Sequence, residues 1–365
     1  MAKNINNIAK QLSELKEKIV LIYAFNNTGK TRLSVEYKNH TKAINDDKHA
    51  GVYYNAFSED LFVWDNDEIN GNEDIKLNVI GSSLNKFHQT FSEEPVWEKL
   101  APFKPKYDFY FEINDPEKGI EAIRFYEKGN LEKSIKISRG EERIFVWCFF
   151  LALFEVEGWS DEQAAHFFID DPVSSLDDNN IFITASTLFK LLEDYVDTRK
   201  IIITSHHYGI LSILFDWLNK GEKADKFKNN DKQKTKKFIS YFLESDGENL
   251  KLTKPNKGVM LYHLRLLQII DTALNKEKRV YTYHLALLRQ VLENISSFLG
   301  VGQFSHVLRE IGITDPARTS DIINALSHQK IYYYQNDIAV PENQKILEDV
   351  FNAIQTKYNF VLHND

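Results

Sequence analysis

The sequence has one cysteine among 365 residues, Cys148, and no long uninterrupted apolar stretch. A lone cysteine can form neither an internal disulfide nor a cysteine-based zinc site, which favours a reducing compartment. No window approaches the roughly 18 apolar residues of a membrane span, and the polar start lacks the apolar core of a signal peptide. We therefore expect a cytoplasmic protein with no membrane segment.

The sequence also lacks the positive excess of a wholly nucleic-acid-binding protein, because its net charge is −8. The charge is uneven, since the first 250 residues are acidic and the remainder is slightly basic. Eight lysines against three acids lie within residues 220–237. A solvated loop is the simpler interpretation of this segment, and contact with a phosphate backbone is the alternative.

The length predicts about two domains. Up to about residue 254 the pattern mixes strands and helices, and after it the pattern turns helical. Two apolar runs separated by a helix indicate buried parallel strands, and three alternating stretches indicate an antiparallel sheet. We predict an α/β domain over 1–254, with a lysine-rich insertion at about 220–237, and a mostly α-helical domain over 255–365. The parallel strands are expected at 165–171 and 200–207, and the antiparallel ones at 109–113, 122–126 and 133–137.

The segment AFNNTGKT (24–31) lies between an apolar strand and a helix. It matches a phosphate-binding P-loop except that Ala24 replaces the first glycine. Backbone amides and the helix N-terminus would hold phosphates, Lys30 would reach the terminal phosphates, and the Thr31 hydroxyl would bind Mg²⁺. The predicted nucleotide contacts are Asn26, Asn27, Thr28, Gly29, Lys30, Thr31 and Arg32.

Three further segments follow in the order that a nucleotide-hydrolysing head of the ABC/SMC type requires: ISRGEE (137–142), FFIDDPVSSLD (167–177) and Thr204–His206. The first segment resembles the ABC signature loop. Its residues Ser138, Gly140 and Glu141 would contact a nucleotide bound to a second subunit. A homodimer or higher homo-oligomer is therefore implied.

The acidic strand end and the histidine complete this resemblance. Asp170 is placed to hold Mg²⁺, and Asp171 stands where such ATPases usually have a catalytic glutamate. Residues 175–177 resemble the D-loop, and His206, favoured by register over the adjacent His207, resembles the switch histidine that senses the terminal phosphate. Only 106 residues separate Thr31 from Ser138, too few for both the antiparallel sheet and a long coiled-coil arm, which disfavours a chromosome-organising machine.

The helical region contains Arg289 and Glu293, four residues apart and thus on one helix face. The simpler interpretation is a surface ion pair. Leucines beside the pair and His328 downstream allow another, because arginine, glutamate and histidine together suit metal-independent RNA cleavage. In that chemistry a base takes the 2′-OH proton, an acid protonates the leaving oxygen, and a fixed cation stabilises the phosphorane.

Over most of its length the chain resembles the PrrC family of bacterial anticodon nucleases. The resemblance is carried by IYAFNNTGKTRLS (22–34), YNAFSEDLF (54–62) with WDND (64–67), SRGEE (138–142) and FIDDPVSSLDD (168–178). It implies an ABC-type NTPase head joined to a helical, HEPN-like nuclease domain that cuts a tRNA anticodon loop, leaving a 2′,3′-cyclic phosphate and a 5′-OH.

The resemblance also implies roles and partners. The Arg–x3–Glu…His triad of the family falls on Arg289, Glu293 and His328, while Asp171 and His206 keep the NTP hydrolysis roles that the ABC-type motifs indicate. GTP or ATP with Mg²⁺ would drive activation, and a thymidine nucleotide (dTTP) would hold the active form. A type I restriction–modification complex would silence the enzyme until phage infection.

The sequence departs from the family at two places. Asn27 stands where a P-loop glycine is expected, and the tRNA-reading segment is shortened to about residues 254–262, which leaves the identity of the tRNA open. The candidate reading residues are Lys254, Asn256, Lys257 and Tyr262. Tyr281, Tyr283 and residues 332–334 could stack anticodon bases, although core packing is the simpler role.

Two other functions compete with the nuclease. One is an ATPase scaffold or sensor that docks a separate effector, and the other is a DNA-repair ATPase. The scaffold predicts that alanine at Arg289, Glu293 and His328 leaves toxicity unchanged. The DNA-repair ATPase predicts hydrolysis that DNA ends stimulate and that these three substitutions do not affect. The nuclease hypothesis predicts that each substitution abolishes RNA cleavage while nucleotide binding persists.

Overall fold

The computed structural model describes residues 4–55, 58, 60–80, 91–115, 119–155, 165–172, 178–245, 249–255, 262–328 and 338–362. The chain divides into two compact units, Met1–Pro255 (unit 1) and Asn256–Asp365 (unit 2). None of the helices in the described part of the chain is long and apolar enough to span a membrane.

Unit 1 is built on a six-stranded sheet in the order β11-β10-β1-β9-β8-β2. All neighbours are parallel except the antiparallel pair β10 and β11. The apolar runs of the sequence are its central strands, because a parallel sheet covered on both faces buries every residue. The strands are β1 (Ile19–Tyr23), β2 (Gly51–Tyr54), β8 (His166–Asp170), β9 (Lys200–Ser205), β10 (Phe238–Ser245) and β11 (Leu250–Thr253).

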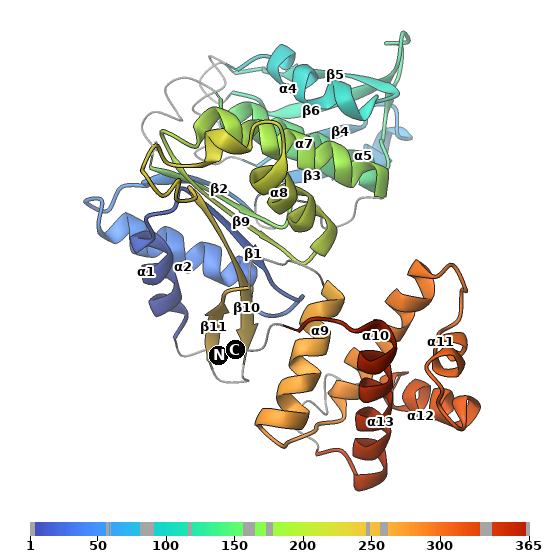
Figure 1. Ribbon diagram of the computed structural model, residues 1–365. Helices are drawn as coiled ribbons and strands as arrows, with labels where there is room; N and C mark the ends of the chain where they lie inside the picture. The colour runs from blue at the N-terminus through green and yellow to red at the C-terminus, as the bar shows by residue number, and fades with distance from the viewer. Residues whose placement is uncertain are drawn as a thin grey trace. The chain divides into compact units, whose positions relative to one another are not determined.

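Alternate residues of these strands pack against different helices. Val20 and Phe168 share a buried cluster with Leu12 and Leu33, which come from α1 (Ile5–Glu14) and α2 (Lys30–Ala43). Phe167, on the opposite face, contacts the Tyr195 ring of α7 (Asp178–Tyr195). Helix α8 (Tyr208–Lys220) packs beside α7 and against β1 and β9, so it covers that same face. Helices therefore cover both sides of the sheet (Figure 1).

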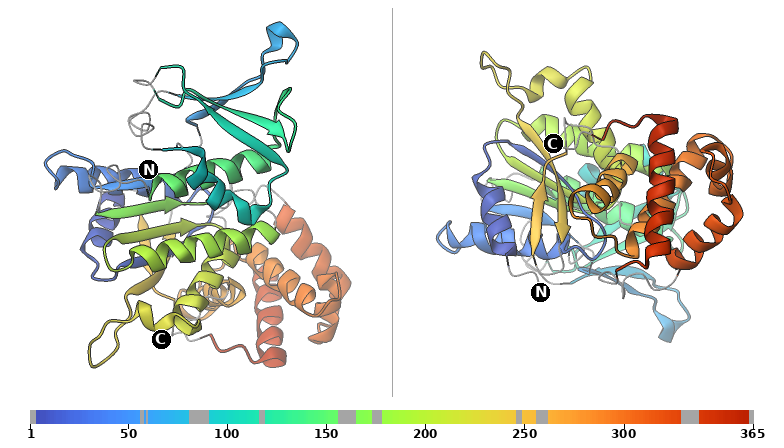
Figure 2. Two further views of the ribbon diagram at one scale, coloured as in Figure 1. Left: turned by 90° about the horizontal axis from the view of Figure 1, so that it is seen from above. Right: turned by 60° about the horizontal axis from the view of Figure 1, so that its bottom comes forward.

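Unit 1 also contains a second sheet, which is antiparallel and five-stranded. Its strand order is β3-β4-β6-β5, with β7 paired to β6. Phe109 and Phe125 of this sheet pack edge-on against Phe145 of α5, each with ring centroids 4.9 Å apart. The β3–β4 hairpin extends beyond the rest of the sheet (Figure 2). The elements are β3 (Phe62–Asp65), β4 (Lys76–Val79), β5 (Tyr107–Glu112), β6 (Ala122–Glu127), β7 (Ser134–Ile135), α4 (Glu93–Leu100) and α5 (Arg139–Leu153), with short 3-10 turns at Glu68–Asn70, Ala101–Phe103 and Ala224–Phe227.

Unit 2 is helical, with α10 at its centre in contact with α9, α11, α12 and α13. Leu285, Leu288 and Leu292 of α10 are fully buried in its core, as the helical spacing of the sequence predicts. The helices are α9 (Tyr262–Asp271), which continues as a π-helical turn (Thr272–Lys276), α10 (Tyr283–Phe298), α11 (Phe304–Glu310), α12 (Pro316–His328) and α13 (Pro341–Tyr358). The predicted fold class, an α/β head with an antiparallel subdomain and a mostly helical C-terminal part, is confirmed.

Candidate functional site

The segment that resembles a P-loop joins the carboxyl end of β1 to the first turn of α2. Gly29, with φ +104, and Asn27, with φ +64, both adopt left-handed backbone conformations. Glycine takes this conformation at no steric cost, and asparagine tolerates it better than most residues. The local backbone thus explains how asparagine stands at Asn27 in place of the expected glycine.

Lys30 begins α2 and folds its side chain back over the loop. Its Nζ donates to the backbone oxygens of Ala24 (3.5 Å) and Phe25 (3.4 Å) and to Oδ1 of Asn26 (3.4 Å). It also lies 3.5 Å from Oδ2 of Asp171, and only 7% of the side chain is exposed. The ammonium is therefore held inside the loop, at the place where the N-terminus of α2 favours anions.

Asp170, the last residue of β8, accepts hydrogen bonds from two threonine hydroxyls. Thr31 donates to Oδ2 at 2.6 Å, and Thr204 of the adjacent strand β9 donates to Oδ1. Burial raises the pKa of Asp170, and these two hydrogen bonds only partly offset that rise. The Thr31 hydroxyl and the Asp170 carboxylate are hard oxygen donors that suit Mg²⁺.

The pairing of Thr31 and Asp170 fits a magnesium site completed by a ligand. No group of three or more His, Cys, Asp or Glu side chains converges within the described ranges of the chain. Mg²⁺ does not require such a group, because it usually takes one or two protein oxygens and completes its shell with water and phosphate.

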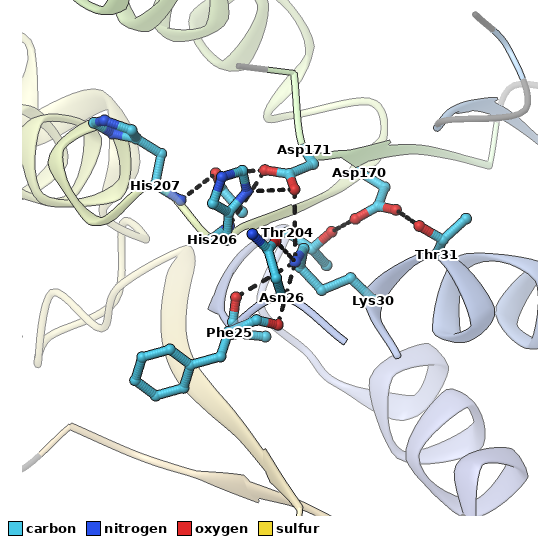
Figure 3. Close-up of polar contacts among 11 residues, drawn as sticks. Phe25, Asn26, Lys30, Thr31, Asp170, Asp171, Thr204, His206 and His207 are labelled. Carbon is cyan, nitrogen blue, oxygen red and sulfur yellow. Dashed lines mark hydrogen bonds and ion pairs between the residues drawn. The ribbon is translucent and has the colours of Figure 1, made fainter. Parts of the chain in front are cut away.

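Asp171 accepts polar contacts from four directions. Ser205 Oγ donates to its Oδ1 at 3.0 Å, and the backbone N–H of His206 donates to the same oxygen at 3.2 Å. His206 Nδ1 lies 2.5 Å from Oδ2, the oxygen that also faces Lys30 (Figure 3). Burial by itself raises the pKa of Asp171, but the His206 hydrogen bonds and the Lys30 charge together lower it below its ordinary value. The carboxylate is therefore anionic and fully engaged at neutral pH.

Two contributors to this site, Thr204 and Ser205, were not assigned roles from the sequence alone. Both are fully buried at the carboxyl end of β9, where Asp170 and Thr204 are register partners across the β8–β9 pair. The signal was the polar pair that ends an otherwise apolar strand, since parallel neighbours bring such ends to one edge. His207 joins this network through its backbone N–H, which donates to Ser205 Oγ at 3.0 Å.

The segment that resembles the signature loop forms the N-terminus of α5. Ser138 is the N-cap, and Glu141 accepts hydrogen bonds from both the backbone N–H (2.9 Å) and the hydroxyl (2.7 Å) of Ser138. This capping box explains the Ser-x-x-Glu spacing by local structure. At Gly140, in the first turn, a Cβ would meet no heavy atom of the described residues within 4 Å, apart from its chain neighbours and the backbone of its own helix.

The WDND stretch (64–67) contacts the start of this same helix. Trp64 Nε1 donates to Oε2 of Glu142 at 2.8 Å. Lys136, just before the loop, donates to Oδ1 of Asn66 at 2.8 Å, and its ammonium lies 5.4 Å from the centroid of the Trp64 ring. The stretch therefore braces the loop that begins α5, which gives a physical reason for its position in the fold.

In unit 2, Arg289 and Glu293 form a direct pair on α10. Arg289 Nε donates to Oε1 of Glu293 at 2.8 Å, with 22% and 39% of the two side chains exposed. The guanidinium also lies 6.0 Å from the centroid of the Phe304 ring. His328 ends α12, a helix that packs on α10, but its side chain lies outside the described residues.

The remaining predicted site residues are placed unevenly. Arg32 is exposed in the first turn of α2, and Lys254 is exposed after β11. Tyr262 begins α9, but its side chain lies outside the described residues. Also outside the described residues are Asn256, Lys257, the D-loop at 175–177 and the tyrosines at 332–334.

The lysine-rich segment is mostly engaged with unit 1 itself. Lys223 and Lys226 pair with Glu193 of α7, and Lys237 pairs with Asp197. Lys220, Lys228 and Lys236 contact Asp216, Asp225 and Asn219. These contacts favour the interpretation of a solvated, internally neutralised surface over that of a phosphate-binding surface.

The chain is similar to several known proteins. A family model described as an AAA domain matches residues 93–352. A protein of Escherichia coli named anticodon nuclease is 32% identical over 397 residues, which cover 91% of this chain and 91% of that protein. Among solved structures, the complex of archaeal ribosomal stalk protein aP1 and ribosome recycling factor aABCE1 matches with 13% identity and a TM-score of 0.34. That match covers 66% of this chain and 38% of the other.

Proposed function

The chain belongs to the anticodon nuclease family, and from this membership we propose that it is a nucleotide-gated tRNA endoribonuclease. In this proposal unit 2 cuts a tRNA within its anticodon loop, and nucleotide hydrolysis in unit 1 controls the cut. The observation that carries the proposal is the Arg289–Glu293 pair. The pair is partly exposed on α10, the central helix of unit 2. The chain that contains it is 32% identical to an anticodon nuclease.

The cleavage step needs a base, an acid and a fixed cation. Glu293 and His328 would share the proton transfers, one taking the proton of the 2′-OH and the other donating a proton to the 5′-oxygen. The 2′-oxygen forms a bond to the adjacent phosphorus while the bond from phosphorus to the 5′-oxygen breaks. Arg289, oriented by its hydrogen bond to Glu293, would stabilise the negative charge of the phosphorane. The products are a 2′,3′-cyclic phosphate and a 5′-OH, and no metal takes part.

The nucleotide would bind at the carboxyl edge of the sheet in unit 1. Thr31 and Asp170 would hold Mg²⁺, and residues Asn26–Arg32 would surround the phosphates. Lys30 already points into the loop, so a terminal phosphate would replace Asp171 as its partner. Asp171 would then be free to polarise the attacking water, and His206 would sense the terminal phosphate through the contact it now makes to Asp171.

The signature loop supports a dimeric mechanism. Ser138 and Glu141 are exposed or partly exposed at the start of α5, where Ser138, Gly140 and Glu141 would close over a nucleotide bound to a second copy. GTP or ATP would serve as the hydrolysed nucleotide and dTTP as a stabilising ligand of the active form. A type I restriction–modification complex would keep the enzyme silent in phage defence, and Lys254, Asn256, Lys257 and Tyr262 would read the tRNA.

The proposal is tested with purified protein, total tRNA and either ATP or GTP with Mg²⁺. Wild type is compared with Glu293→Gln, which keeps the size of the side chain but removes its charge, and with Lys30→Ala. We expect wild type to generate 5′-OH ends in an anticodon loop, Glu293→Gln to hydrolyse nucleotide without cutting, and Lys30→Ala to lose both activities. Cutting by Glu293→Gln at the wild-type rate would contradict the proposed chemistry, and cutting by Lys30→Ala would contradict the gating.

A further inference from the structure

Three rings gather where the chain enters α10. The rings of Tyr281 and Tyr283 are nearly parallel, with centroids 6.1 Å apart and an interplanar angle of 15°. The His284 ring lies 4.1 Å from that of Tyr283 and 5.9 Å from that of Tyr281. His284 is buried, whereas both tyrosines are partly exposed. The two tyrosines therefore present a stacked aromatic surface at the N-terminal end of the helix that carries Arg289.

His284 fixes this aromatic surface. Its Nδ1 accepts a hydrogen bond from the backbone N–H of Tyr281 at 3.0 Å. Burial lowers the pKa of His284 to about 4, so the ring is neutral at physiological pH and Nδ1 can act as an acceptor. The preceding residue is also held, because the N–H of Ala339 donates to the backbone oxygen of Val280 at 2.9 Å. The tyrosines are thus ordered before a ligand binds, which lowers the entropic cost of binding.

The two tyrosines do not belong to the core of unit 2. Tyr358 and Phe360 pack against that core, but in the described part of unit 2 neither Tyr281 nor Tyr283 forms or lines it. Both rings contact the buried His284 ring and stay partly exposed, so a ligand can still reach them.

A basic turn leads into the aromatic surface. The π-helical turn that follows α9 ends at Lys276, and exposed Lys278 and Arg279 follow with Glu277 as the one acid among residues 276–279. The turn is structured, since the N–H of Arg279 donates to the backbone oxygen of Ala273 at 3.0 Å. Cations beside stacking aromatic rings are the usual features of sites for unpaired nucleic acid.

From these observations we infer that Tyr281 and Tyr283 stack an unpaired nucleobase of the RNA substrate, and that Lys278 and Arg279 contact its phosphates. Tyr283 and Arg289 are six residues apart on α10, a rise of about 9 Å along the axis. Six residues turn an α-helix by about 600°, so these two side chains leave α10 about 120° apart, and an RNA loop that contacts both must bend around the helix. This inference rests on the proposed function, because it takes the same RNA as the ligand.

Binding is measured in the full-length His328→Ala protein, so that RNA is not consumed, with labelled total tRNA from Escherichia coli as the probe. In this background Tyr283→Leu is expected to weaken binding about tenfold, the loss of one stacked base, whereas Tyr283→Phe keeps affinity within about twofold. Arg279→Gln should reduce the slope of log affinity against log salt by about one. Tyr110→Leu is the matched control, because Tyr110 is an exposed tyrosine that also contacts a second tyrosine, Tyr126, but in unit 1.

Each outcome decides the inference. Unchanged affinity in Tyr283→Leu, or an equal loss in Tyr283→Phe, would overturn it, and the proposed function would stand if wild type still cuts tRNA. No binding of tRNA by the parent protein would overturn both. Thermal unfolding of each variant controls for folding, and Tyr281→Leu provides the same test if Tyr283→Leu does not fold.

Discussion

The carboxylate of Asp171 lies 2.5 Å from Nδ1 of His206, and the same carboxylate oxygen lies 3.5 Å from the Lys30 ammonium. His206, which follows β9, and Lys30, which begins α2, thus both contact one carboxylate oxygen of Asp171, the residue that follows β8. In the proposed function, a bound nucleotide would compete with Asp171 for Lys30. The arrival of the terminal phosphate would then release Asp171 from the ammonium.

Asp171→Asn is expected to bind nucleotide nearly as well as wild type but to hydrolyse it about 100-fold more slowly, because the amide cannot accept a proton from water. Phosphate release and the binding of a fluorescent nucleotide, measured on the same preparation, check the two halves of this prediction. Hydrolysis at the wild-type rate would mean that another group activates the water.

Dimerisation should depend on Ser138. With Mg²⁺ and ATP, Asp171→Asn is expected to form a dimer in light scattering, and adding Ser138→Arg should keep it monomeric, because the larger side chain blocks closure over the partner's nucleotide. Thr198→Arg is the control, since Thr198 is exposed near the amino end of β9, away from the nucleotide edge. A dimer that survives Ser138→Arg would contradict the trans arrangement.

His284 should make the stability of unit 2 depend on pH. Its pKa is lowered from 6.5 to about 4 by burial, so between these values the unfolded chain binds a proton that the folded chain does not. Stability therefore falls as pH drops through this window, by about 2 kcal/mol between pH of about 7.5 and about 5. Urea unfolding at both pH values should show this dependence reduced in His284→Gln and retained in His306→Gln, a partly exposed histidine. Equal dependence in wild type and His284→Gln would contradict the burial argument.

Local patterns in the sequence predicted those parts of the site that local structure determines. The P-loop, the acidic end of β8 and the Arg289–Glu293 pair each depend on residues a few positions apart, where strand ends and helical spacing dictate placement. Asn27 was recognised as a departure, and its left-handed backbone supplies the reason.

Contacts between distant segments could not be predicted. Gly51–Tyr54 and Phe62–Asp65 are close in the sequence but belong to different sheets. The bond from Trp64 to Glu142 joins residues 78 positions apart, and that of Ser205 to Asp171 depends on the register of two parallel strands. Such contacts follow from tertiary packing, which neither periodicity nor composition encodes.

The most direct test of the central claim is expression of wild type and His328→Ala in a bacterium, followed by sequencing of the 5′-OH ends of cellular tRNA. We expect discrete cuts within one anticodon loop in cells that express wild type and none in cells that express His328→Ala at equal level. The same cuts in both strains would contradict the assigned triad, and wild-type cuts confined to positions outside anticodon loops would contradict the proposed function.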